Sequence, residues 1–295
     1  MPFKQEDLEE ALEQYNHKAV QLQCDECVKD LYRMPEEKTI PELEKIMKAL
    51  RQKRMFKAMV IIGDACMRTE KNSFTIQRLF AQGLIERGLF TAALAVLHDL
   101  KKDTQASDKE KAEDENAEAY GLIGRVYKQL FVNAASPKQT LSKNFIQHAL
   151  NSYHEKYKEN PQKHLYHGIN AVALAVRAAN DEINLSDTPD IEITSLDLIR
   201  QVELNKAEKI RDGKKSEPWD LAVAVEANVA LQRYTEALTW AQEYTQSDGD
   251  AFEFASTARQ LTEVWQLDKI VDGNAQLILS IVRAALLKKH GGNVI

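Results

Sequence analysis

The chain has 295 residues, a formal net charge of −6 at pH 7 and a sequence pI of about 5.7. Phosphate backbones and anionic lipid repel so acidic a chain, and no basic run is long enough to override this, so we expect neither nucleic-acid nor membrane binding. Its 11 glycines and 7 prolines fall below the roughly 21 and 15 of average usage. Few turn residues, with abundant Ala, Leu, Glu, Lys and Gln, predict an all-α protein of long helices.

The amino-terminal residues 1–13 are acidic and helical in pattern, whereas a secretory signal has basic residues followed by an apolar run. No apolar stretch reaches the 18 residues that a membrane-spanning helix requires. We therefore expect a cytoplasmic protein. Its three cysteines, Cys24, Cys27 and Cys66, are an odd number in a reducing compartment, so we expect no disulfide framework.

Apolar residues recur at i, i+3, i+4 and i+7 along most of the chain, which predicts amphipathic helices. The predicted helices cover residues 5–31, 41–53, 56–69, 73–87, 89–102, 109–133, 140–158, 163–179, 194–210, 218–232, 234–245, 251–267 and 270–289. Residues 39–42 and 194–197 resemble capping boxes, and Ser216 precedes Pro218 as at a helix start. Residues 101–116 and 180–193 are predicted to be connecting loops, with disordered interaction tails as the alternative. A further alternative for the first stretch is that it extends the helix that begins near Asp108.

The clearest internal repeat lies in the first hundred residues. Phe56 and Phe90 each precede a small residue that opens an apolar run, and aligning Ala58 with Ala93 gives a period of 35. This spacing is close to the 34 residues of the tetratricopeptide repeat, in which a small residue of the second helix permits close packing on the first. Similar segments surround Ala149, before Pro161, and Ala237. The pattern predicts a tetratricopeptide-like α-solenoid of antiparallel helix pairs, with the four alanines buried at helix crossings.

A more specific likeness begins near residue 117. Four segments carry it: residues 118–128 (Glu-Ala-Tyr-Gly-Leu-Ile-Gly-Arg-Val-Tyr-Lys), 149–161, 166–171 (Tyr-His-Gly-Ile-Asn-Ala) and 218–220 (Pro-Trp-Asp). In order and rough spacing they resemble the TRAF-binding, central regulatory region of apoptosis signal-regulating kinases and its bacterial relatives. Val126 stands where that family has Ile, and Pro218 where it has Tyr. The signature residues of this resemblance are Gly124, Tyr127, Gly168, Asn170 and Trp219.

The resemblance covers about residues 117–267 and implies a regulatory domain that docks proteins and sets the activity of a neighbouring module. It implies no catalysis, and the kinase parts are missing from the chain: there is no Gly-rich phosphate loop, no His-Arg-Asp and no Asp-Phe-Gly. We predict a single helical-repeat domain over residues 1–295, with N-terminal repeats in 1–104 and TRAF-binding-like repeats in 105–295. The predicted function is a protein-binding regulatory scaffold that controls an associated effector or signalling module.

The first helix of each pair lines the concave groove of a tetratricopeptide array. On this basis the residues predicted to bind the partner are Arg78, Gln82, Arg125, Lys128 and Glu226. Arg125 and Lys128 share one helix face, opposite Leu122, Val126 and Leu130, so we expect them to point away from the core, present positive charge to an acidic partner and add little to folding. The alternative for both is ordinary surface charge or an ion pair to a neighbouring repeat.

Several polar and small residues lie within predicted helices and need a structural reason. Gly121, Gly124 and Gly168 indicate close helix crossings, because each glycine weakens a helix by about 1 kcal/mol relative to Ala. Asn170 lies in an apolar run, which favours a buried hydrogen bond at a helix crossing over ligand contact. The three tryptophans, Trp219, Trp240 and Trp265, have apolar neighbours and are read as core, or together as the rim of a groove.

Other functions require residue groups that are incomplete here. Cys24 and Cys27 have the i, i+3 spacing of a zinc or dithiol pair but lack a second pair. His164 and His167, with His148 and His154 upstream, lack a carboxylate to complete a metal site. A thiol or metal enzyme is therefore the weakest alternative, and we expect no cofactor. A peptide-tail adaptor of the co-chaperone type would need a clamp of two or more Lys or Arg, for which the basic residues are too scattered. The partner and the oligomeric state stay open.

Overall fold

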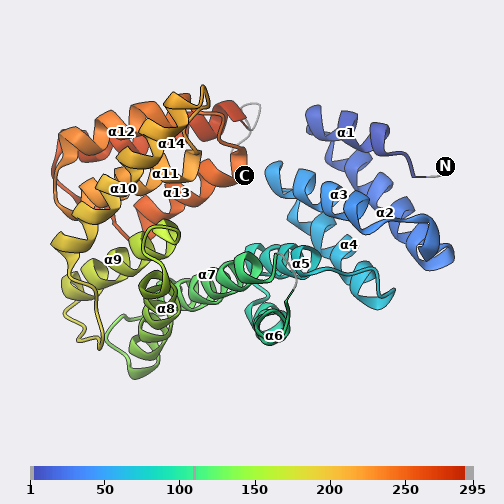
Figure 1. The fold of residues 1–295 in the computed structure, drawn as a ribbon, viewed down its shortest axis with the longest axis horizontal. Coiled ribbons are helices and arrows are strands. Elements are labelled where there is room, and N and C mark those ends of the chain that lie inside the picture. The colour runs from blue at the N-terminus through green and yellow to red at the C-terminus, as the bar shows by residue number, and fades with distance from the viewer. Residues whose placement is uncertain (1–2, 109–110, 290–295) are drawn as a thin grey trace. The chain divides into compact units, whose positions relative to one another are not determined.

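In the computed structural model, which describes residues 3–108 and 111–289, helix follows helix and those ranges contain no strand (Figure 1). The helices are α1 (Gln5–Glu13), α2 (His17–Arg33), η1 (Pro35–Glu37), α3 (Ile40–Gln52), α4 (Phe56–Arg68), α5 (Phe74–Glu86), α6 (Phe90–Gln105), α7 (Ala112–Val132), α8 (Thr140–Glu159), α9 (Leu165–Asn180), α10 (Ile191–Arg211), α11 (Pro218–Ala230), α12 (Tyr234–Gln246), α13 (Ala251–Glu263), η2 (Leu267–Lys269) and α14 (Gly273–Lys289). The predicted all-α fold is confirmed.

The helices pack in tetratricopeptide-like pairs within two compact units, Met1–Val126 and Tyr127–Ile295. In the first unit α1 packs on α2, α3 on α4 and α5 on α6. In the second, α9 packs on α10, α11 on α12 and α13 on α14. We call the first helix of each of these pairs, together with α7, the leading helices; they are the odd-numbered helices α1 to α13. Successive leading helices also touch, as α3 and α5 do in one unit and α9 and α11 in the other, which is the stacking of an α-solenoid.

The predicted first helix, 5–31, is wrong in one respect, because the structure breaks it into α1 and α2. Tyr15 adopts φ of 51° between them, and the Asn16 side chain accepts a hydrogen bond from Ala19 N to start α2. Leu12 and Val20 on either side of the break are buried in one core. The apolar periodicity therefore continues across the turn, which is why the pattern alone suggested a single helix.

Helix starts follow the local capping chemistry. The capping box at Thr39 is confirmed: Glu42 Oε2 accepts from Thr39 N at 2.9 Å, and Thr39 Oγ1 accepts from Glu42 N at 3.4 Å. The box predicted at 194–197 is wrong, because Asp190 Oδ1 accepts from Ile193 N and α10 starts three residues earlier than expected. Helix α11 starts at Pro218 as predicted.

Small residues lie where helices approach closely. Ala58, Ala93, Ala149 and Ala237 are all buried, at most 5% exposed, as the repeat pattern predicted. Gly168 shows the reason for a helical glycine most clearly: a Cβ added there would lie 2.7 Å from two ring atoms of Tyr157 on α8. The predicted close crossing at Gly168 is therefore confirmed.

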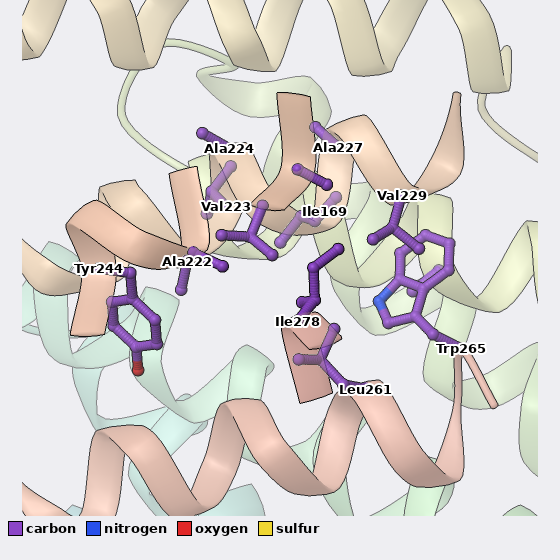
Figure 2. Close-up of a cluster of buried hydrophobic side chains, with 14 of the residues drawn as sticks. Ile169, Ala222, Val223, Ala224, Ala227, Val229, Tyr244, Leu261, Trp265 and Ile278 are labelled. Atoms are coloured by element: carbon purple, nitrogen blue, oxygen red, sulfur yellow. The ribbon is translucent and has the colours of Figure 1, made fainter. Parts of the chain in front are cut away.

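The core of the second unit is drawn in Figure 2, where side chains from α9, α11, α12 and α14 converge with those of α13 and the turn that follows it. Among them Tyr244 is fully buried and its hydroxyl lies 3.0 Å from Thr257 Oγ1. Trp265 is buried in this core and Trp240 packs against it, in line with their predicted role. Trp219 is half-buried and lies elsewhere, against other aromatic rings.

The repeat register yields a stability prediction at Ala93. Replacing Ala93 by Leu should lower the free energy of unfolding by about 1–3 kcal/mol, because the added methylenes overpack a closed crossing. Ala92, its exposed neighbour on α6, provides the control: Ala92→Leu should leave the melting temperature nearly unchanged. Equal melting curves for the two variants would show that the assigned register is wrong.

Candidate partner-binding surface

Leading helices of the first unit are joined by polar side chains. Gln82 Oε1 on α5 accepts from Arg51 Nε on α3 at 3.0 Å. Arg78 Nε on α5 donates to Glu115 Oε2 on α7 at 2.6 Å, and Thr75 Oγ1 donates to the other oxygen of the same carboxylate at 2.6 Å. Gln82 and Glu115 are buried. Gln82 therefore binds the preceding leading helix of its own chain, and Arg78 binds the following one.

Arg125 has the same kind of partner. Its guanidinium on α7 forms an ion pair and hydrogen bond with Glu86 on α5, and the whole residue is only 8% exposed. The expectation that Arg125 points away from the core is wrong. The physical reason is that α7 is packed on both faces here: Leu122 and Val126 are buried on one side, and Glu86 supplies the countercharge on the other. The alternative of an ion pair to a neighbouring repeat is what the structure contains.

Lys128 lies at the centre of a network in the second unit. Its Nζ donates to Asn170 Oδ1 on α9 and to Gln260 Oε1 on α13, both at 2.6 Å. Gln260 Nε2 also donates to Asn170 Oδ1, at 3.1 Å, and Asn170 Nδ2 donates to the Tyr166 carbonyl. The predicted structural hydrogen bond of Asn170 is thus confirmed. Because one ammonium connects three leading helices, we expect Lys128 to contribute to folding, which reverses the prediction from the sequence.

Glu226 on α11 completes this polar network, which we define as Lys128, Asn170, Glu226, Gln260 and Trp265. Glu226 Oε2 accepts from the indole Nε1 of Trp265 at 2.7 Å, and the carboxylate is buried. Burial raises the pKa of Glu226 to about 7, although the Trp265 and Gln260 hydrogen bonds and the charge of Lys128 act against that rise. The predicted groove residue is therefore an interior acid that changes charge near neutral pH.

A row of aromatic side chains lies at the amino-terminal ends of three leading helices. Tyr166 of α9, Trp219 of α11 and Phe252 of α13 form edge-to-face pairs, with ring centroids 5.7 Å apart for the first pair and 6.5 Å for the second. Phe252 is buried, whereas Tyr166 and Trp219 are half-buried. We call these three residues the aromatic row. Its two accessible members could contact a partner without unfolding the helices.

The remaining signature residues are structural. Gly124 is buried on α7. Tyr127 packs half-buried against the cluster that contains Phe131, Ile146 and Tyr153. No sequence signal identified the partners Glu86, Glu115 and Gln260, which lie 37 to 132 residues from the groups they bind. The burial of Glu226 could have been predicted from the sequence, because Glu226 is the one acidic residue within the apolar stretch 221–230.

The cysteines and histidines form no reactive centre in the described ranges. Cys24, Cys27 and Cys66 are fully buried, and burial raises their pKa values to about 12, 11 and 12, so all three are thiols at neutral pH. Within residues 3–108 and 111–289 no group of three or more His, Cys, Asp or Glu could hold a metal ion.

The four histidines do not converge on one site. His164 and His167 stack edge to face with centroids 5.3 Å apart. His154 Nδ1 lies 2.7 Å from the Asp187 carbonyl oxygen, and His148 stacks on Tyr127 at 5.0 Å between centroids. Each therefore has a packing or hydrogen-bonding role of its own.

Residues 40–175 match the family model described as TPR-S, Tetratricopeptide Repeats-Sensor. The match spans a little under half of the chain and supports a tetratricopeptide-like region there, a type of repeat that typically mediates protein–protein interaction and is not catalytic. No curated protein and no solved structure matches the chain. Across the described residues, no helix is both long and apolar enough to cross a membrane.

The position of Glu226 yields a pH prediction. Its pKa is higher in the folded chain than the ordinary value of 4.5, so the folded state binds more protons than the unfolded state between about 4.5 and 7. The free energy of unfolding should therefore fall as pH rises through this window. Glu226→Gln keeps an acceptor for Trp265 but removes the titration, so it should flatten the fall.

The control is Glu236→Gln on α12, because Glu236 is exposed and its replacement should leave the slope unchanged. Chemical denaturation of both variants and the parent chain at several pH values measures the slopes. If Glu226→Gln retains the slope of the parent chain, Glu226 is not the group that titrates.

Proposed function

We propose that this chain is a regulatory scaffold whose leading-helix face, at the aromatic row, docks a protein partner and thereby controls an effector. The observation that carries the proposal is the half-buried pair Tyr166 and Trp219, held edge to face at 5.7 Å on two successive leading helices. Tyr and Trp are the side chains most enriched at binding hot spots, because they present large, rigid surfaces at little entropic cost.

The polar network supports the aromatic row from within the same helices. Tyr166 lies one turn before Asn170 on α9, and the Tyr166 carbonyl accepts from Asn170 Nδ2 at 2.8 Å. Trp219 lies two turns before Glu226 on α11. A surface whose supporting side chains are already bonded loses little conformational entropy when a partner binds.

The five residues first assigned to the partner surface fit this proposal as positioning residues. Arg78, Gln82, Arg125, Lys128 and Glu226 each engage another leading helix or the turn after α13. Lys128 and Glu226 fix the spacing of helices in the second unit, which carries the contact residues, whereas Arg78, Gln82 and Arg125 join α3, α5 and α7 in the first unit. The same pairing disfavours the co-chaperone alternative, since a carboxylate clamp needs basic side chains directed at the peptide.

The proposal that the chain controls an effector is supported by its similarity to two protein families. The segments 118–128 and 166–171 resemble the TRAF-binding region of the apoptosis signal-regulating kinases, and the family matched over 40–175 is described as a sensor. Both point to a chain that reports binding to a neighbouring module. The buried thiols, with pKa values of about 11 and 12, make a thiol enzyme the least supported alternative.

Trp219 provides the test. Once a partner has been captured by the full chain and identified, Trp219→Ala should weaken its binding at least about tenfold, as expected for a hot-spot aromatic. Trp240→Ala is the matched control, because Trp240 is also half-buried but lies on α12 and stacks under Lys206.

Thermal unfolding of both variants separates lost contact from lost folding. The proposal predicts similar losses of stability but weakened binding only for Trp219→Ala. Equal affinity for the two variants would place the partner elsewhere on the chain.

A further inference from the structure

Helix α10 exposes apolar side chains on the face that it turns away from its core. They are Ile193, Leu196, Leu204 and Ile210, with exposed fractions of 61%, 38%, 55% and 62%. At 3.6 residues per turn these four positions fall within about 120° of the helix circumference and extend over about 26 Å. Single exposed apolar residues are ordinary, whereas a stripe of four on one helix face marks an interaction surface.

The orientation of this apolar stripe is fixed by the opposite face of α10. Leu198 and Val202 are fully buried in the core of the second unit, and Ile191 and Ile199 pack against that core. Rotating the helix to hide the stripe would expose these residues instead. Because both faces carry apolar residues, packing on its own chain leaves one apolar face of α10 exposed.

The charges of α10 are divided along its length. Residues 190–199 contain three acidic residues and no basic one: Asp190, Glu192 and Asp197. Residues 200–211 contain four basic and two acidic residues: Arg200, Lys206, Lys209, Arg211, Glu203 and Glu208. Lys206 and Lys209 pair with Glu243 and Glu217 of the same unit. Arg200, Glu203 and Arg211 lie along the stripe at 3.6 residues per turn, and Arg211 also pairs with Glu208 of the same helix at 3.8 Å.

This division is self-complementary when two copies of the helix run antiparallel. A two-fold axis near Arg200 places Leu196 of one copy against Leu204 of the other and Ile193 against Ala207. The two Arg200 side chains then face each other at the axis, and each lies about one turn from Asp197 of the other copy, which supplies the countercharge. Each Arg211 lies beside Asp190 of the other copy. A parallel arrangement would instead bring the two acidic ends together.

We propose that α10 is a self-association surface, at which two copies of this chain pair through antiparallel α10 helices. A two-fold axis uses the same patch on both copies, which suits a stripe whose two halves complement each other in charge. A single helix pair buries less than the roughly 800 Å² per partner of a standard interface. We therefore expect a micromolar, concentration-dependent dimer.

Sedimentation velocity of the full chain, from roughly 1 to 200 µM, tests the proposal. The parent chain should shift from monomer to dimer within that range. Leu196→Glu with Leu204→Glu should raise the dissociation constant at least about tenfold. The control is Leu141→Glu with Leu277→Glu, two similarly exposed leucines on α8 and α14, which should leave the dissociation constant unchanged.

Charge variants identify the second copy as the occupant. Asp197→Arg and Arg200→Glu should each weaken self-association, because each replaces the attraction between Asp197 of one copy and Arg200 of the other by repulsion. An equimolar mixture of the two variants should associate again, since one copy then offers only basic and the other only acidic groups at these positions. A parent chain that stays monomeric up to the highest concentration, a dimer that survives the double leucine change, or a mixture that fails to associate would each overturn the proposal.

Discussion

The Lys128 ammonium holds three leading helices that lie far apart in the chain. Lys128 belongs to α7, and its Nζ lies 2.6 Å from the side-chain oxygens of Asn170 on α9 and Gln260 on α13. Gln260 is 132 residues away from Lys128 in the sequence. The amide oxygens of Asn170 and Gln260 are buried, so without that donor each would lose a partner that water cannot easily replace. The spacing of these helices therefore depends on Lys128 together with the hydrogen bond from Gln260 Nε2 to Asn170 Oδ1.

In the first unit, too, basic side chains connect leading helices, but their acceptors are carboxylates in place of amides. Arg78 meets Glu115, and Arg125 meets Glu86, so that α5 and α7 are joined at two points. Buried ion pairs often add little net stability, because desolvating two charges offsets much of their attraction. Their larger effect here is geometric: a misplaced helix would leave a charge unpaired. The apolar core supplies most of the driving force, while these pairs select the stacking.

The sequence predicted the helices well because amphipathic periodicity and helix caps are local properties. The capping box at Thr39 and the small residues Ala93 and Gly168 were identified from neighbours alone. The break at Tyr15 was missed, since periodicity continues through it. The orientation of Arg125 was wrong for another reason: a charged residue was assumed to face solvent, and its countercharge 39 residues away leaves no local trace.

A double-mutant cycle between Lys128 and Gln260 tests most directly whether the polar network holds the leading helices together. Lys128→Met, Gln260→Leu and the double variant would be unfolded in denaturant as full chains, with Lys143→Met on exposed Lys143 as a control. The network predicts a loss of stability for each single variant and a coupling free energy of about 1 kcal/mol or more between them. Additive effects, or a Lys128→Met variant as stable as Lys143→Met, would contradict it.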